Sequence, residues 1–463
     1  MSKQYRVKCR EIDYTGKGLV TFNQSTFAVP YLLDGETAKI ELVYGKDRKS
    51  TTAKLAEVEV TSPERREPVC PAFSKCGGCQ LQHMDYEKQL AIKQAMAEHW
   101  LGAFVGTSKA TTSKSAVNTH TNTGASILPI IGAKNPYHYR HKMHATFSRT
   151  RQGMKLGIYE ENSHRVINVK DCAIQNKAAN AILKTIRTLA DRFHLTAYNE
   201  DTRQGLLRHV LIRCSHHTGQ IMVVLVLGTT NFPNKNAFLD ALRKAHPEIT
   251  TIVQNINNQK TSMVLGKQET VLYGNGWIED SLCGLTFRIS PKSFYQVNPE
   301  QTELLYQTAM TFAGLTGKET VLDTYCGTGT IGLIASQYAA KVIGVESNAA
   351  AVRDAVAGAR TNQIENAEFV CEDAGAFMKK ATTAPDVVFM DPPRSGSDEA
   401  FLSALVRLAP ARVVYISCNM ETQARDLAYL TKHGYAVDKI QPVDLFPWTE
   451  HCESVCLLKR LSN

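Results

Sequence analysis

The sequence predicts a multidomain α/β protein whose C-terminal part is a doubly wound domain with a mostly parallel sheet. Three observations lead to this fold class. The chain has 463 residues, too many for one hydrophobic core. From residue 291 onward, short apolar runs alternate regularly with helical stretches. Residues 1–61 instead contain only short strand-like runs, so a separate N-terminal domain is expected.

The overall composition is that of an ordinary globular protein, with 43% hydrophobic and 21% charged residues. No run of 18 apolar residues is present, and residues 1–10 lack an apolar signal core. We therefore expect a cytoplasmic protein without membrane association, and nothing indicates an obligate protein partner. In a reducing compartment, the twelve cysteines are expected to bind metal or act in catalysis rather than form disulfides.

In the N-terminal domain, residues 1–61, five short alternating runs are punctuated by glycines and other turn residues. This spacing predicts a small β-barrel of the oligonucleotide-binding type. The positive and negative charges of the segment nearly balance, so any RNA contact there would depend on local patches.

The central domain is predicted to span residues 62–290, with a helix at 85–101 and a flexible insertion at 106–126 that is almost entirely small and polar. Residues 131–217 carry 15 Lys and Arg against 6 Asp and Glu, with aromatic residues interleaved. Cations bind phosphates and aromatic rings stack on bases, so this segment is predicted to contact nucleic acid. A solvated, mildly basic surface is the alternative.

A glycine-rich turn opens the C-terminal domain, residues 291–463. Gly327, Gly329 and Gly332 follow an apolar strand and precede a helix, which predicts a turn that lets the backbone approach a nucleotide-type ligand. Glu346 ends the next strand and could accept both ribose hydroxyls. This pattern alone does not separate NAD enzymes from other nucleotide-binding enzymes.

Asp391-Pro392-Pro393 distinguishes between these classes. It ends the apolar strand VVFMD with a rigid turn that places a carboxylate near the reactive end of a cofactor. Such turns are typical of S-adenosylmethionine methyltransferases that act on planar nitrogen or base substrates. For any one acid at these strand ends, including Asp323, a helix cap or a solvated loop end is the alternative.

Cys418 lies at the carboxyl end of the strand at 413–416, on the same rim as Asp391. A thiolate that adds to carbon 6 of uracil makes carbon 5 nucleophilic enough to accept a methyl group. Glu453 precedes the last apolar strand and can return to this rim as the base that removes the carbon-5 proton. An inert buried thiol and a surface acid are the alternatives.

Cys70, Cys76 and Cys79 form the pattern C-x5-C-G-G-C, which predicts a metal site in a cytosolic chain. Cys172 is the best candidate for a fourth ligand. We favour an iron–sulfur cluster held by four thiolates, and structural zinc is the alternative. A site with four protein ligands would be closed, which indicates a structural role.

Six motifs together resemble one family, the bacterial 23S rRNA (uracil-C5)-methyltransferases that carry a TRAM domain and a [4Fe-4S] cluster. The motifs are CGGCQLQ at 76–82, SFYQVN at 293–298, DTYCGTGTIG at 323–332, DPPR at 391–394, SCN at 417–419 and HCE at 451–453. The resemblance covers nearly the whole chain apart from the insertion. Tyr295, Cys452 and His141 depart from the residues common in the family, and only His141 could alter RNA contacts.

The resemblance implies a role for each site residue. Cys418 would be the nucleophile and Glu453 the base. S-adenosylmethionine would be contacted by Gln296, Tyr325, Glu346 and Asp391, and the [4Fe-4S] cluster would be held by Cys70, Cys76, Cys79 and Cys172. The implied fold is a Rossmann-like methyltransferase domain behind a TRAM barrel and a central α+β domain.

The implied substrate is one or two uridines of 23S rRNA, because the tRNA branch of the family usually lacks both the TRAM domain and the cluster. Methylation of carbon 5 of a uridine in tRNA is the alternative. An RNA-binding module with a vestigial methyltransferase fold is a third interpretation, and the joint presence of the glycines, the acids and the thiol argues against it.

Overall fold

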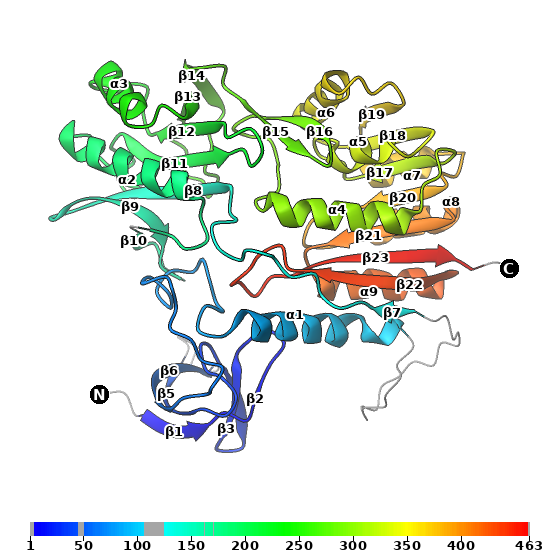
Figure 1. The fold of residues 1–463 in the computed structure, drawn as a ribbon, viewed down its shortest axis with the longest axis horizontal. Helices are drawn as coiled ribbons and strands as arrows, with labels where there is room; N and C mark the ends of the chain where they lie inside the picture. The colour runs from blue at the N-terminus through cyan, green and yellow to red at the C-terminus, as the bar shows by residue number, and fades with distance from the viewer. Residues whose placement is uncertain (1–3, 45–50, 106–124, 162, 170, 462–463) are drawn as a thin grey trace.

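The computed structural model describes residues 4–44, 51–105, 125–161, 163–169 and 171–461 (Figure 1). The helices are α1 (Tyr86–Leu101), α2 (Lys177–Arg192), α3 (Lys235–Ala245), α4 (Pro299–Ala313), α5 (Thr330–Ser336), α6 (Ala349–Thr361), α7 (Ala374–Lys380), α8 (Glu399–Leu408) and α9 (Met420–Lys432), with a 3₁₀ turn at Gly102–Phe104. Within these described ranges, no helix combines the length and apolar character needed to cross a bilayer.

In the part of the chain that the structure describes, the strands fall into five sheets. The first two contain β1 (Gln4–Lys8), β2 (Glu11–Ile12), β3 (Gly18–Phe22), β4 (Ser25–Val29), β5 (Thr37–Tyr44) and β6 (Thr51–Val60). The central sheet and a hairpin contain β8 (Lys142–Thr150), β9 (Gly153–Tyr159), β10 (Val166–Asn168), β11 (Leu207–Cys214), β12 (Ile221–Leu227), β13 (Ile249–Ile256), β14 (Gln268–Tyr273), β15 (Ile278–Leu282) and β16 (Leu285–Ile289). The C-terminal sheet contains β7 (Ser126–Ile127), β17 (Thr320–Thr324), β18 (Lys341–Glu346), β19 (Ala367–Cys371), β20 (Val387–Met390), β21 (Arg412–Ser417), β22 (Tyr435–Val443) and β23 (Glu453–Arg460).

The N-terminal region has six strands where the sequence indicated five. They form two three-stranded antiparallel sheets, β1-β5-β6 and β2-β3-β4. The additional strand β2 has only two residues, too few to show an alternation in the sequence. Val7, Val20 and Ile40 are buried between the two sheets.

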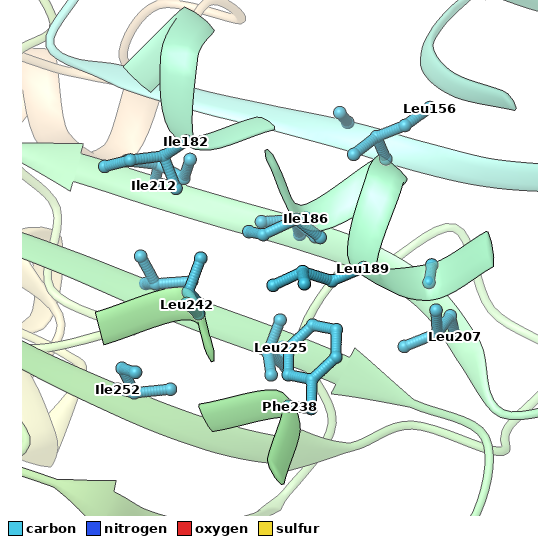
Figure 2. Packing of buried hydrophobic residues seen from close by; sticks show 14 of the residues in the cluster. Leu156, Ile182, Ile186, Leu189, Leu207, Ile212, Leu225, Phe238, Leu242 and Ile252 are labelled. Carbon is cyan, nitrogen blue, oxygen red and sulfur yellow. The ribbon is translucent and has the colours of Figure 1, made fainter. Parts of the chain in front are cut away.

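The central sheet has seven strands in the order β10-β9-β8-β11-β12-β13-β14, and all neighbours are antiparallel except β12 and β13. β11 and β12 are buried along their whole length, which explains their continuous apolar character. Figure 2 shows Ile182, Ile186 and Leu189 of α2 packed over Ile212 and Leu225 of the sheet, where α3 joins the same core.

The C-terminal sheet confirms the predicted α/β fold class. Its strand order is β19-β18-β17-β20-β21-β23-β22-β7. β17 to β21 run parallel to one another, and β23 lies antiparallel between β21 and β22. The order reverses between β17 and β20, so the carboxyl ends of these two strands flank the crevice where open α/β sheets bind ligands.

Two elements outside the predicted C-terminal domain pack onto its sheet. β7 pairs with β22 at the sheet edge, and α1 runs along β22 and α9, with Ala97 and Leu101 in the same apolar core (Figure 1). Residues 106–124 of the predicted insertion lie outside the described residues. Ser126, at the end of the predicted flexible stretch, is instead the first residue of β7. The proposed domain boundaries stay predictions.

Part of the basic excess in residues 131–217 is internal rather than on a surface. Arg208 is buried and its guanidinium binds the Glu200 carboxylate and the carbonyl of Asn257. Arg213 is buried and donates to the carbonyls of Pro291 and Ser293. The charge count alone therefore overstates the surface available for phosphates.

A buried ion pair joins α1 to the loop at residues 444–452, which connects β22 to β23. Lys93 Nζ lies 2.6 Å from Asp444 Oδ1, and neither side chain is exposed. Asp444 Oδ2 also accepts from the Tyr86 hydroxyl at 2.8 Å and from Gln89 Nε2 at 3.1 Å. The carboxylate therefore has a partner at each oxygen, which offsets the desolvation of both charges.

We predict that Lys93→Met destabilises the protein by about 3–5 kcal/mol, because it leaves the Asp444 carboxylate buried without a counter-ion. Urea unfolding followed by circular dichroism measures the change. The matched control is Lys341→Met, which removes the exposed pair between Lys341 and Glu368 (2.8 Å) and should cost less than about 1 kcal/mol. Equal effects of the two substitutions would contradict the prediction.

Candidate active site

The glycine-rich turn between β17 and α5 closes around Asp323. The buried Asp323 carboxylate accepts from the Gly332 backbone N–H at 2.7 Å, and a Cβ on Gly332 would come within 2.9 Å of that oxygen. Its other oxygen has no hydrogen-bond partner among the described residues. Burial raises the pKa of Asp323 to about 8. Gly332 therefore allows the close contact that the predicted motif requires.

Glu346 lies at the end of β18 and folds over the same turn. One carboxylate oxygen accepts from the Gly327 N–H at 3.1 Å, and the other accepts from the Asn348 N–H at 2.7 Å. The side chain is half-buried. These contacts place the carboxylate beside the glycine turn, at the carboxyl edge of the sheet.

Tyr325 occupies the first position of the turn with φ +61°, an uncommon conformation for a bulky residue. Its hydroxyl donates to Ser397 Oγ at 3.3 Å, and its ring packs on Phe401 with centroids 5.2 Å apart. Tyr325 thus ties the glycine turn to the loop that follows Asp391.

Asp391 follows β20 on the opposite side of the switch point, and burial raises its pKa to about 7. Tyr306 of α4 is buried nearby, where the charges of Asp391, Glu453 and Asp323 all act on its hydroxyl. The Gln296 side chain lies near this hydroxyl and acts on its pKa in the opposite direction. The SFYQVN segment therefore reaches the crevice through Tyr306.

Cys418 and Glu453 come together because β21 and β23 are antiparallel neighbours. Ser417 pairs with Ser454, so the residue after β21 and the first residue of β23 meet at one edge of the sheet. Glu453 is buried, and Cys418 is partly exposed. The thiol can therefore contact a ligand while the acid remains shielded from water.

Arg394 connects these groups electrostatically. Burial raises the pKa of Cys418 to about 11, and the charges of Glu453 and Asp391 contribute to this shift. The positive charge of Arg394 and its hydrogen bond to the thiol lower the pKa. Burial and Asp391 raise the pKa of Glu453 to about 8, again against the effect of Arg394. The guanidinium thus favours the ionised form of both groups.

The turns that carry Arg394 and Cys418 are bonded to each other. Asn419 Nδ2 and Thr422 Oγ1 donate to the Arg394 carbonyl at 3.0 and 3.2 Å. Asn419 also caps α9 by accepting from the Glu421 N–H at 3.1 Å. The Ser-Cys-Asn sequence therefore ends a strand, begins a helix and holds the neighbouring turn.

All four cysteines predicted to bind a cluster line one cavity of about 270 Å³. Cys70, Cys76 and Cys79 come from the loop before α1, and Cys172 comes from the segment between β10 and α2. Two hydrogen bonds within the loop support it, because Gln82 donates to the Cys79 sulfur at 3.2 Å and accepts from the Cys70 N–H at 3.1 Å. The fold therefore brings Cys172 close to three cysteines that precede it by more than 90 residues in the sequence.

Within the described residues, no group of three or more His, Cys, Asp or Glu side chains is arranged to hold a single metal ion. The four thiols line one shared cavity. As thiolates they are suitable ligands for an iron–sulfur cluster and for zinc.

Sequence reasoning missed two contributions to this site. It gave Tyr306 no role, because a tyrosine within a helix of mixed apolar pattern is indistinguishable from a core residue. It also assigned no function to Arg394, although its position after the proline turn could have indicated one. Asp373, by contrast, caps α7 by accepting from the Ala376 N–H at 2.9 Å, which is the ordinary use of such an acid.

Comparison with known proteins places this site in a family. The family described as tRNA (Uracil-5-)-methyltransferase matches residues 131–461. An uncharacterized RNA methyltransferase of Halalkalibacterium halodurans is 39% identical over 456 residues, covering 98% of this chain and 96% of that protein. Another, from Clostridium acetobutylicum, is 39% identical over 467 residues, covering 100% and 98%.

A solved structure shows the same fold. It is that of the Pyrococcus abyssi tRNA (uracil-54, C5)-methyltransferase in complex with S-adenosyl-L-homocysteine, with a TM-score of 0.76 and 23% identity, covering 98% of this chain and 100% of that chain. The resemblance inferred from the motifs is thereby confirmed for the family. The chain belongs to the tRNA (uracil-5-)-methyltransferase family and is an S-adenosylmethionine-dependent RNA methyltransferase of the uracil-C5 type.

Proposed function

We propose that this enzyme methylates carbon 5 of one or two uridines in 23S rRNA, with Cys418 as nucleophile and Glu453 as base. The observation that carries this proposal is the meeting of Cys418 and Glu453 at one edge of the sheet, beside Asp391 and Arg394. An enzyme that methylates an exocyclic amine would need no thiol there. The pairing of a nucleophile and a buried acid therefore supports chemistry on a ring carbon.

The cofactor pocket lies at the switch point between β17 and β20. Glu346, Tyr325, Gln296 and Asp391 would hold S-adenosylmethionine there, and the Glu346 carboxylate could accept hydrogen bonds from the ribose hydroxyls. The orphaned oxygen of Asp323 and the raised pKa of Asp391 fit a positively charged ligand that these carboxyls would meet. When bound, S-adenosylmethionine supplies a methyl group activated by its sulfonium.

The protein groups then act in sequence on the uracil ring. The Cys418 thiolate adds to carbon 6, and the electron pair of the 5,6 double bond moves to carbon 5 and the carbonyl oxygen at position 4. Carbon 5 takes the methyl group. Glu453 removes the proton left on carbon 5, the double bond re-forms, and the carbon–sulfur bond breaks to return the thiolate.

Three cations on α2 support RNA binding by the central region. Lys177, Lys184 and Arg187 line a cavity of about 660 Å³ together with Asn168 and Asn180. Neither lysine forms an ion pair with a carboxylate among the described residues, so both can bind phosphates. The assignment to ribosomal RNA rests on the motif resemblance, and tRNA is the alternative that the matched family and the Pyrococcus abyssi structure favour.

We propose that Cys70, Cys76, Cys79 and Cys172 hold a [4Fe-4S] cluster. The shared cavity lined by all four thiols supports this assignment, and structural zinc is the alternative. The cluster would join the loop before α1 to the segment before α2. Its role would be structural, because four thiolates leave no iron open to a substrate.

Mapping of 5-methyluridine tests the substrate. In a strain that lacks this protein, we expect specific 5-methyluridines to disappear from 23S rRNA while those in tRNA remain. Complementation with the wild-type protein should restore them, and complementation with Cys418→Ala should not. Loss of the modification from tRNA with unchanged ribosomal RNA would favour the alternative substrate.

Trapping with 5-fluorouridine RNA tests the nucleophile. Fluorine at carbon 5 prevents proton removal, so the wild type should accumulate a covalent adduct, and Cys418→Ala should form none while still binding S-adenosylmethionine. Because the pKa of Cys418 is raised to about 11, the thiolate fraction and the rate of trapping should rise with pH across the neutral range. Cys371→Ala, an exposed thiol at the end of β19, is the matched control, and an adduct with Cys418→Ala would refute the mechanism.

Metal analysis tests the cysteine site. We expect anaerobically purified protein to contain about four iron atoms and sulfide per chain and to absorb visible light. Cys76→Ser should lose most of this absorption, whereas Cys214→Ser, a buried thiol outside the cavity, should retain it. Stoichiometric zinc without iron would contradict the assignment.

A further inference from the structure

Trp448, in the loop at residues 444–452, packs in the cluster that includes Cys172 and lies shortly before Glu453 in the sequence. Its buried ring belongs to one apolar cluster with Tyr139, Cys172 and Ile174, against which Cys79 also packs. The ring stacks on Tyr137 with centroids 5.0 Å apart. The tryptophan therefore contacts the surroundings of two of the four candidate ligands.

Backbone contacts bind the same residue to the cysteine loop. The N–H groups of Gln80 and Leu81, which directly follow Cys79, donate to the Trp448 carbonyl at 2.9 and 3.0 Å. The indole Nε1 donates to the Pro136 carbonyl at 2.9 Å, and the Trp448 N–H donates to Gln89. Trp448 has φ +69°, a strained conformation for a bulky residue that these contacts must maintain.

The path from Trp448 to Glu453 is short and internally bonded. Thr449 Oγ1 donates to the Phe446 carbonyl at 2.8 Å and accepts from the His451 N–H at 3.3 Å. Glu453 itself pairs with Val443 at the other end of the loop. The segment between Trp448 and Glu453 therefore contains few flexible residues. A shift of Trp448 should also shift the Glu453 carboxyl group.

We propose that Trp448 is a positioning residue that couples the packing of the four-cysteine site to the placement of the Glu453 carboxyl group. This inference rests on the proposed function. Cys418 follows β21 and precedes α9. The hydrogen bonds of Trp448 are formed with Gln80, Leu81, Gln89 and Pro136, which lie outside these two elements. Disturbance of Trp448 should therefore slow removal of the carbon-5 proton more than addition of the thiolate.

Single-turnover assays on the full-length protein test this coupling, using S-adenosylmethionine and a uridine-containing RNA substrate. Mass spectrometry would follow two quantities, transfer of the methyl group and the fraction of protein trapped as the methylated covalent adduct. We expect Trp448→Leu to form this adduct at nearly the wild-type rate and to release product at least about tenfold more slowly. Glu453→Gln provides the benchmark for complete arrest at the same step.

The matched control is Trp277→Leu, since Trp277 lies against the Arg288 guanidinium, 3.7 Å from the ring centroid, and outside this cluster. It should release product at the wild-type rate. Trp448→Phe keeps an aromatic ring but loses the bond to Pro136, so it should slow the same step by less. This second variant keeps the test valid if Trp448→Leu fails to fold.

A double-mutant cycle tests the link to the cysteine loop. Gln82→Leu removes the contacts to Cys70 and Cys79 without removing a thiol, and it should also slow product release. If both residues act through one path, the double variant with Trp448→Leu should be little slower than the slower single variant, and independent effects would multiply.

Two results would overturn the inference. One is wild-type product release by a folded Trp448→Leu protein. The other is an equal loss of cofactor binding, adduct formation and release, which would indicate a general structural role. Failure of the wild type to form any adduct or 5-methyluridine would instead overturn the proposed function, and the inference with it.

Discussion

The buried carboxylate of Asp444 is the constraint on which the arrangement of the active site depends. Through Tyr86, Gln89 and Lys93 it attaches three successive turns of α1 to the start of the loop at residues 444–452. That helix begins just after the cysteine loop, and the other end of the 444–452 loop begins β23. The buried Asp444 carboxylate thus connects α1, which follows the cysteine loop, to the loop that leads into β23 and Glu453. Because an unpaired charge there would be costly, the three elements are held as one unit.

The same desolvation gives the crevice its chemical character. Asp323, Asp391 and Glu453 all have pKa values raised by burial. A carboxyl group with a raised pKa binds more protons in the folded than in the unfolded protein, so it lowers stability as pH rises from its ordinary pKa toward the raised value. A cationic ligand in the crevice would favour the ionised carboxyls and offset this cost. The buried carboxyls are therefore less stable without a cationic ligand than with one. Glu453, the proposed base, has its pKa raised to about 8.

How much the sequence could predict depended on whether a residue's role was local. The glycine turn, Asp391 and Cys418 follow apolar strands directly, so their positions at one edge of a parallel sheet followed from the alternation of strands and helices. Tyr306 and Asp444 could not be predicted in this way, because their partners lie far away in the chain. The charge excess of residues 131–217 was misleading for the same reason: Arg208 and Arg213 are satisfied by distant carbonyls inside the protein.

The reversed direction of β23 explains why Cys418 and Glu453, the proposed nucleophile and base, are held by different elements. In a wholly parallel sheet, both would follow strand ends and would each be held by a helix start, as Cys418 is by the Asn419 cap of α9. Because β23 is antiparallel to β21, its first residue, Glu453, lies at the edge of the sheet where Cys418 lies. The preceding loop therefore determines the position of Glu453. The loop is anchored by α1 and the cysteine loop, and also by Asn298 and Gln301, which donate to the carbonyls of Leu445 and Asp444. In the proposed mechanism, addition of the thiolate and removal of the proton are thus supported by different parts of the fold, so a substitution could alter one step while the other is retained.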